Sequence, residues 1–369
     1  MMNVSTPRIY VDWGSWAKAM GIFEVHNITP EWGSDELWAS KIGLNPSNVT
    51  TFEGTTNVDH NYVRVESGAF SDEDFPNYVA VLGHNLASAK GFFYVETNND
   101  GTDNTGVTEE EVINWRVWNS GDIDAIDYNG FSICTFDNAD TDSGQRTGIS
   151  INIIGEKFYT GESADHLNFV EDVKIGSICY GKYFDFSHSP DLSLTMSIEQ
   201  DGITTQQTKG GSTLTNMRYN GTPKWGELGA WELGDGSVAS TLGARGGRRV
   251  WNLTFSYLSS KQTLPINALG NTVFDIANAS NYTASTDTEV GDYTDGVDSD
   301  YFNSNVLDGE DFFSAVWNKT QGLPFIFQPS GNNANPDQFA ICRWDMNSLN
   351  IKQVAYNTYT ISLKIREVW

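Results

Sequence analysis

The stretch Gly322–Trp369 reads GLPFIFQPSGNNANPDQFAICRWDMNSLNIKQVAYNTYTISLKIREVW and decides the fold class. Two compact apolar runs, PFIF and FAIC, flank a polar loop, and a longer alternating segment follows them. One face of that segment carries Tyr359, Ile361, Leu363, Ile365 and Glu367. Strict alternation of this kind is typical of a strand with one buried face. The end of the chain therefore predicts β-strands.

The rest of the chain repeats this pattern at short intervals, with turn residues between the apolar segments. Further strands are expected at 62–66, 77–82, 91–96, 112–118, 131–136, 148–154, 173–186, 192–198 and 250–258. Short strands separated by turn signals, together with 35 glycines, predict an all-β protein built as a β-sandwich or jelly roll. The clearest helical spacing is in 309–317, where acidic residues precede an apolar face and Gly322 lies beyond its end.

The C-terminal segments PFIFQP, FAIC and LKIREVW resemble the C-terminal regions of virion proteins from tailed bacteriophages. This resemblance implies a building block of a particle, of the tail or baseplate type, and carries no catalytic content. It also implies that the protein is made in the host cytoplasm and is located in the virion. The N-terminus has no basic region followed by an apolar one, so no signal peptide is expected.

The corner Gly83-His84-Asn85-Leu86 and the segment VKIGSICYGKYFDF resemble discoidin-like (galactose-binding-like) β-sandwich modules of phage structural proteins. In that resemblance His84 and Asn85 are structural: they turn the chain and bond to nearby backbone. The alternative is that His84 is a base or a metal ligand. No Ser, Cys or carboxylate stands at a spacing that supports this alternative.

These features predict two β domains joined by a connecting segment. The predicted ranges are 1–190 for a discoidin-like sandwich, 191–240 for the connection, and 241–369 for a β domain with one short helix and an acidic insertion at 284–311. The first range opens with an irregular, Trp-rich lead-in over residues 1–60, whose tryptophans pack in a core or contact a sugar or a subunit. The connection is either an arm that pairs with a neighbouring subunit or a long hairpin.

The net charge of −26 limits the classes of partner that this 369-residue chain can bind. So acidic a surface repels nucleic acid, and no apolar run has the length that a membrane helix needs. The three cysteines, Cys134, Cys179 and Cys342, are distant in sequence and lie in apolar segments. They are expected to be buried free thiols, with a disulfide pair as the alternative.

Two groups of side chains are candidates for contact with a subunit or a glycan: the aromatic residues Trp115, Trp118 and Tyr128, and the basic residues Arg245, Arg248 and Arg249. A third group, Asp137, Asp140 and Asp142, offers oxygen atoms to Ca²⁺. Its spacing departs from that of an EF-hand, and solvated turns are the alternative. No cofactor other than this ion is expected.

The sequence thus predicts a non-enzymatic structural protein of a tailed phage. The expected position is the tail tip, baseplate or fibre attachment, and the expected partners are copies of itself and other virion proteins. A carbohydrate-binding protein that attaches to host surface glycans and a capsid decoration or head-fibre protein are alternatives. A polysaccharide-degrading enzyme is the third class, but none of the motifs G-x-S-x-G, H-E-x-x-H, C-x-x-C or P-loop is present.

Overall fold

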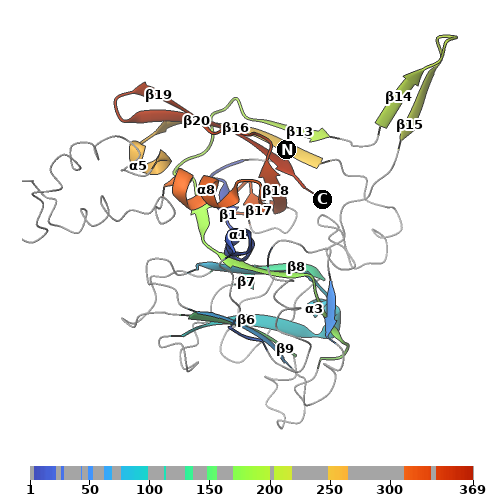
Figure 1. Cartoon of the computed structure of the whole chain (residues 1–369), viewed down its shortest axis with the longest axis vertical. Coiled ribbons are helices and arrows are strands. Elements are labelled where there is room, and N and C mark those ends of the chain that lie inside the picture. Colours follow the sequence, from blue (N-terminus) through green and yellow to red (C-terminus); the bar gives the residue numbers. More distant parts are fainter. Residues whose placement is uncertain are drawn as a thin grey trace, which may run out of the picture.

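The structure, a computed structural model, describes residues 4–21, 26–28, 43, 49–52, 62–68, 76–98, 112–113, 129–135, 148–155, 169–199, 203–217, 248–264, 311–333 and 338–368. Among these residues strands dominate, helices are few, and every strand pairing is antiparallel. The predicted all-β class is confirmed. Three sheets lie one above another, and one hairpin projects from the body (Figure 1).

The largest sheet, called here the large sheet, contains eight strands drawn from both ends of the chain. In spatial order they are β12 (Tyr183–Asp185), β1 (Arg8–Tyr10), β17 (Phe325–Gln328), β18 (Ala340–Trp344), β20 (Thr358–Glu367), β16 (Arg248–Leu258) and β13 (Thr195–Glu199), with β19 (Asn350–Ala355) also paired to β20. The C-terminal strands therefore form the framework on which strands from the first half of the chain assemble.

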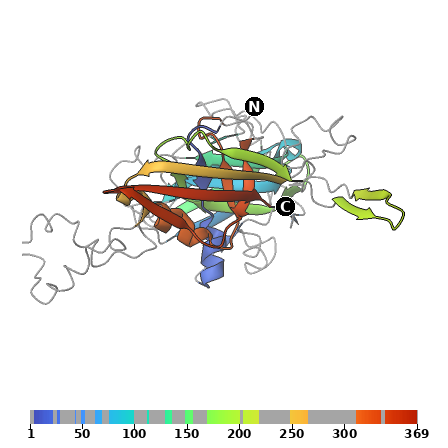
Figure 2. The ribbon, with the colours of Figure 1, turned by 90° about the horizontal axis from the view of Figure 1, so that it is seen from above.

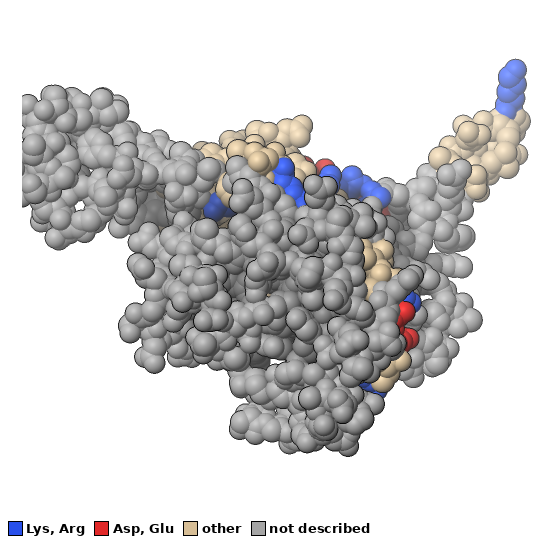
Figure 3. Space-filling view, turned by 60° about the horizontal axis from the view of Figure 1, so that its bottom comes forward, with Lys and Arg blue, Asp and Glu red and all other residues tan. Residues whose placement is uncertain are grey.

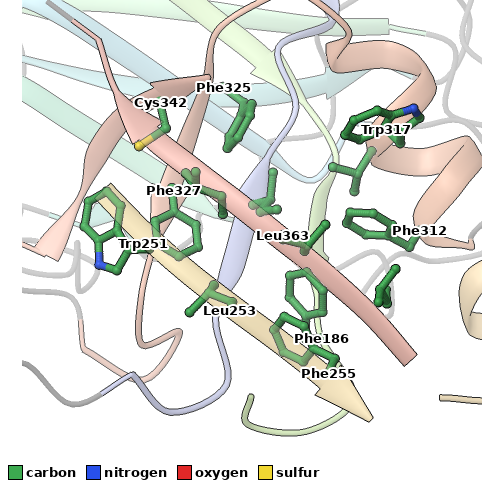
Figure 4. Close-up of a cluster of buried hydrophobic side chains, with 14 of the residues drawn as sticks. Phe186, Trp251, Leu253, Phe255, Phe312, Trp317, Phe325, Phe327, Cys342 and Leu363 are labelled. Atoms are coloured by element: carbon green, nitrogen blue, oxygen red, sulfur yellow. The ribbon is translucent and has the colours of Figure 1, made fainter. Parts of the chain in front are cut away.

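The central strands β1, β17 and β18 are buried on both faces. One face enters the first core, where Phe325 and Phe327 meet residues of β16 and β20 (Figure 4). The other face enters the second core, where Ile326 packs with apolar residues of the neighbouring sheet. Since successive side chains of a strand point to opposite faces, a strand covered on both sides needs an uninterrupted apolar run. This explains the runs PFIF and FAIC.

Strands β16 and β20 are buried on one face only. Ile361, Leu363 and Ile365 of β20 lie in the first core, while Ser362 between them is exposed. The alternation predicted for this segment is confirmed, including the burial of Glu367 at its end. The pairing runs along most of both strands, from Val250 opposite Arg366 to Leu258 opposite Tyr359.

Two four-stranded sheets lie beneath the large sheet in Figure 1. The middle sheet contains β11 (Ser177–Gly181), β5 (Tyr78–His84), β8 (Gly130–Thr135) and β7 (Val112–Ile113), and the outer sheet contains β2 (His26–Ile28), β4 (Tyr62–Gly68), β9 (Gly148–Gly155) and β6 (Gly91–Asn98). Two further ribbons pair β10 (Val173–Ile175) with β3 (Thr50–Phe52), and β14 (Ile203–Gln207) with β15 (Thr213–Met217). The second core joins the large sheet to the middle sheet.

The predicted C-terminal helix is confirmed as a π-helix, η8 (Phe313–Trp317), continued by α8 (Asn318–Thr320). It covers the first core with Phe312, Val316 and Trp317 (Figure 4). Gly322 follows it with a left-handed φ of 72°. The structure adds the four-residue helices α3 (Leu86–Ala89) and α5 (Ser260–Thr263).

The prediction of an irregular lead-in is wrong over residues 8–20. There β1 pairs with both β12 and β17, and helix α1 (Trp13–Met20) follows it. Asp12 caps this helix by accepting bonds from the backbone N–H groups of Gly14 and Ser15. Trp13 packs against the first core, as predicted for the tryptophans, whereas Trp32 and Trp38 lie outside the described residues.

The division into two domains stays a prediction. Strands β1 and β12, both from the range 1–190, belong to the same sheet as the C-terminal strands. The acidic insertion at 284–311 lies outside the described residues except for Asp311. Cys134, Cys179 and Cys342 are buried and free, as predicted. Of the helices that the structure describes, none combines the length and apolar character needed to cross a membrane.

Candidate functional site

The His84–Asn85 corner joins the end of β5 to β10 and β8. The backbone N–H of Leu86 donates to Nδ1 of His84 (3.2 Å), which leaves the Nε2–H to donate to Oγ of Ser132 (2.9 Å). Asn85 accepts the N–H of Lys174 (2.7 Å) and donates through Nδ2 to the carbonyl of Asp172 (2.9 Å). Each side chain replaces a backbone partner at the point where the strand ends, which is how Asn side chains stabilise turns.

His84 is completely buried and holds its proton weakly. Burial lowers the pKa of its imidazole to about 3, because a charged ring has no water around it. Both ring nitrogens are already engaged within the chain. A neutral imidazole with both nitrogens occupied fastens strands together and offers neither lone pair nor proton to a substrate or metal.

Arg249, one of the predicted contact residues, is engaged within the chain. Its backbone N–H and its Nε both reach Oε2 of Glu367, at 2.9 and 3.3 Å, and its Nη2 donates to the carbonyl of Phe339 at 3.1 Å. Its guanidinium also lies 5.0 Å from the ring centroid of Trp251. Burial raises the pKa of Glu367 and the Arg249 charge opposes that shift. The pair closes one end of the first core; the subunit or glycan contact predicted for Arg249 stays a prediction.

Most other predicted site residues lie outside the described residues. This holds for Trp115, Trp118 and Tyr128, for Arg245, and for the calcium candidates Asp137, Asp140 and Asp142. Arg248 is described: it begins β16 and is half-buried. Within the described ranges, no three side chains of His, Cys, Asp or Glu are grouped closely enough to hold a metal ion.

The hairpin β14–β15, residues 203–217, projects furthest among the described elements and is called here the arm. Figures 1 and 2 both show it reaching away from the body of the protein. Its two strands pair only with each other in the described structure, from Ile203 opposite Met217 to Gln207 opposite Thr213. The residues from Thr204 to Asn216 are exposed on both faces.

A tight loop fixes the geometry of the arm. The backbone N–H of Thr208 donates to the carbonyl of Ser212 (2.8 Å), and Oγ1 of Thr208 accepts the N–H of Ser212 (3.1 Å). Gly211 adopts a left-handed φ of 85°, a conformation that glycine reaches without strain. The arm is therefore a specified hairpin. Of the two alternatives that the sequence left for 191–240, the structure shows a hairpin at residues 203–217, and pairing with a neighbouring subunit stays a prediction.

The composition of the arm differs from that of the chain that carries it. Residues 203–217 contain no acid and one base, Lys209, in a chain of net charge −26. The space-filling view accordingly shows a basic tip on an otherwise uncharged projection (Figure 3). Leu214 is 59% exposed on β15. An uncharged, Thr- and Gln-rich surface with an exposed leucine has the low charge of the central part of a protein interface.

A second low-charge surface lies where the β19–β20 turn meets the end of β16. Val354, Tyr356 and Tyr257 are exposed there, with Tyr356 at 96% and Tyr257 at 82%. This set, with the unpaired outer edge of β19, is called here the tyrosine end. The pairings bring its strands together, since Tyr359 lies opposite both Leu258 and Gln353. The segment 350–366 contains no acidic residue.

Tyr257 occupies a strained position within the tyrosine end. Its φ is 64°, and the pairing of β16 with β20 shifts register between Phe255 and Leu258. A bulky residue rarely adopts this left-handed conformation, and strained backbone collects at functional sites. The bulge turns the tyrosine ring out into solvent. The alternating pattern of 250–258 gave no sign of it, because a bulge is set by the pairing between strands.

Comparisons of the chain with protein-family models, with curated proteins and with solved structures each found no match.

Proposed function

We propose that this protein is a non-enzymatic structural component of a tailed-bacteriophage particle that assembles as a symmetric oligomer. The arm carries the proposal: it is a specified hairpin with both faces in solvent, and it projects from a body of three sheets. A two-stranded hairpin alone is marginally stable in water and gains most from a third strand or a covering surface. Such a projection suits a protein that is completed by its neighbours.

Three further observations support a building block. The body has two extended apolar cores: the first packs the C-terminal helix against the large sheet, and the second joins the large sheet to the middle sheet. Burial raises the pKa of the Cys179 and Cys342 thiols, so they stay protonated and unreactive. Both ring nitrogens of His84 form hydrogen bonds within the corner, to Ser132 and to the backbone of Leu86. These three side chains, His84, Cys179 and Cys342, are thus engaged in holding the molecule together.

The proposed position is the tail tip, the baseplate or the fibre attachment, with the first half of the chain as a discoidin-like module. The resemblance of the GHNL corner and of the C-terminal segments to phage virion proteins motivates this part of the proposal. The surface charge of −26 favours contact with other proteins over contact with DNA.

Immunogold labelling of purified particles, with antibody raised against the recombinant protein, tests the function. Label confined to the tail tip supports the proposal, and label spread over the capsid moves the protein to a decoration or head-fibre role. Particles without label, in a lysate rich in the protein, overturn the virion assignment. A glycan array and hydrolysis assays on host polysaccharide then decide between a carbohydrate-binding protein and an enzyme.

A further inference from the structure

We infer that copies of this chain associate head to tail, with the arm of one copy adding to the tyrosine end of the next. This inference rests on the proposed function, because it names the partner of the arm as a second copy of the chain. It follows from where the two surfaces lie, from their charge and from the strand edges that they leave open.

The two surfaces lie at opposite ends of the large sheet. Strand β13, which leads into the arm, pairs with residues 248–252 at the start of β16, whereas Leu258 at the end of β16 pairs beside the β19–β20 turn. The 11 residues of β16 span roughly 35 Å at about 3.3 Å per residue. Figures 1 and 2 both show the arm beyond one end of the large sheet, and Figure 1 shows β19 at the other end.

In this structure the arm points away from β19 of its own copy (Figures 1 and 2). Residues 200–202 join Glu199 of β13 to Ile203 of β14. A fully extended link of that length reaches at most about 14 Å, which is less than half the length of β16. The base of the arm therefore stays at the β13 end of the sheet, and its exposed strands are open to a strand of another molecule.

Both surfaces have strand edges that the described structure leaves unpaired. β19 pairs only with β20, and β14 and β15 pair only with each other. An open edge exposes a row of backbone N–H and C=O groups that a strand from another chain can bond to. Placing the arm along β19 satisfies both rows at once and adds the hairpin to the large sheet.

Charge selects this edge over the other free edge of the large sheet. In an acidic chain, two copies repel except where acids are absent. The arm and the segment 350–366 both lack acids, whereas β13 carries Glu199, which pairs with Arg366 at 2.7 Å. Asp191 lies beside the tyrosine end, where it is half-buried and accepts the hydroxyl of Ser256 at 2.7 Å. Leu214 of the arm and Tyr356 of the tyrosine end supply the apolar contact, of the kind that dominates binding energy in interfaces.

A contact between two different surfaces has a structural consequence. Such a heterologous contact repeats from copy to copy, so it generates a closed ring when the rotation closes and an open chain when it does not. A symmetric ring is the form that the proposed function requires. An arm-to-arm contact would instead stop at a dimer.

Two variants of exposed residues distinguish the head-to-tail contact from an arm-to-arm contact. Leu214→Glu places an acid on the arm, and Tyr356→Glu places one on the tyrosine end. Val170→Glu is the matched control, because Val170 is 55% exposed, bonds through its backbone N–H to Ala89 of α3 and belongs to neither surface. Unchanged thermal melting shows that each variant folds. Sedimentation velocity then gives the association of each variant alone and of the two variants mixed in equal amounts.

The expected result has three parts. Leu214→Glu alone and Tyr356→Glu alone each associate at least about tenfold more weakly than wild type, and Val170→Glu associates like wild type. The mixture forms heterodimers and nothing larger, because only one intact arm faces one intact tyrosine end.

Three results overturn the head-to-tail contact. They are a Tyr356→Glu variant that associates like wild type, a mixture that stays monomeric, and a wild-type protein that stays monomeric at high concentration. None of them removes the protein from the particle, so the immunogold result still decides the proposed function separately.

Discussion

His84 shows how one buried side chain makes a fold sensitive to pH. Its imidazole is neutral in the folded protein with a pKa near 3, against an ordinary value of 6.5 in the unfolded chain. The unfolded state therefore binds more protons between these two values, and stability falls as the pH drops from about 6.5 towards 3. Above about pH 6.5 the His84 corner contributes its full stability.

We expect wild type to lose about 2 kcal/mol more than the variant His84→Gln between pH 7 and pH 5, because only the wild type must keep an imidazole neutral. Glutamine retains a donor and an acceptor near Ser132 and Leu86. Urea unfolding at both pH values measures the difference. Equal losses for the two proteins would mean that His84 reaches water in the folded state.

Tyr257 lowers the stability of the folded protein, unlike the His84 corner, because its backbone is strained and its ring is exposed. We expect Tyr257→Gly to raise the free energy of unfolding by up to about 1 kcal/mol, because glycine adopts a φ of 64° without the steric cost. If the ring contacts the arm of another copy, the same variant weakens association. Thermal melting and sedimentation velocity report the two effects.

Asn357 provides the matched control for Tyr257. It has a φ of 51°, but asparagine tolerates this region, so Asn357→Gly gains less stability. A Tyr257→Gly protein that is less stable than wild type would contradict the assignment of strain to this position.

At the scale of elements, the end of the C-terminal helix is locked to a strand by one hydroxyl group. Oγ1 of Thr320 donates to the carbonyl of Val316 (2.6 Å) and accepts the Nε1–H of Trp344 on β18 (2.7 Å). Thr320 is buried, so water cannot replace it. The contact holds the helix over the first core, where Trp317 and Trp344 meet with ring centroids 5.4 Å apart.

Replacing Thr320 by valine keeps the shape and removes the hydroxyl. We expect Thr320→Val to lower the free energy of unfolding by about 1–3 kcal/mol, because the Trp344 indole loses its acceptor. Thr320→Ser keeps the hydroxyl and serves as the control, with a smaller loss. Chemical denaturation measures both. A valine variant as stable as the serine variant would show that the Trp344 bond contributes nothing net.

The secondary-structure elements differ in how well the sequence pattern predicted them. The alternation of 358–367 predicted β20 and its buried face correctly. A strand that is covered on one face only alternates apolar and polar residues, and this pattern can be read from the sequence. The first sixty residues were read as irregular although Asp12 and Gly21 bracket α1 as helix caps do. Strand β1 is three residues long, too short for any periodicity to reveal.

At the scale of the whole molecule, the charge of −26 opposes both compaction and self-association. The proposed contact avoids acids on both sides, so its attraction is apolar and backbone-based while the long-range repulsion between copies remains. Salt screens that repulsion, with a Debye length that falls from about 20 Å at 0.02 M to about 5 Å at 0.5 M.

We therefore expect association to tighten and thermal stability to rise as NaCl increases over that range. Analytical ultracentrifugation and thermal melting in a salt series check both. The variant Leu214→Glu is the control, because its melting temperature rises with salt while its association stays weak. Dissociation of wild type at high salt would mean that ion pairs drive assembly and would contradict an acid-free interface.

The sequence by itself determined the all-β class, the one-sided strands and the buried thiols, because periodicity, turn residues and apolar context are local properties. Only the tertiary structure decided that PFIF and FAIC are central strands: covering both faces of a strand requires partners from residues 78–82, 251–255 and 313–317. The same holds for the candidate contact surfaces. Whether a strand edge is free or a tyrosine is turned outward depends on pairings distant in sequence, and these exist only once the chain has folded.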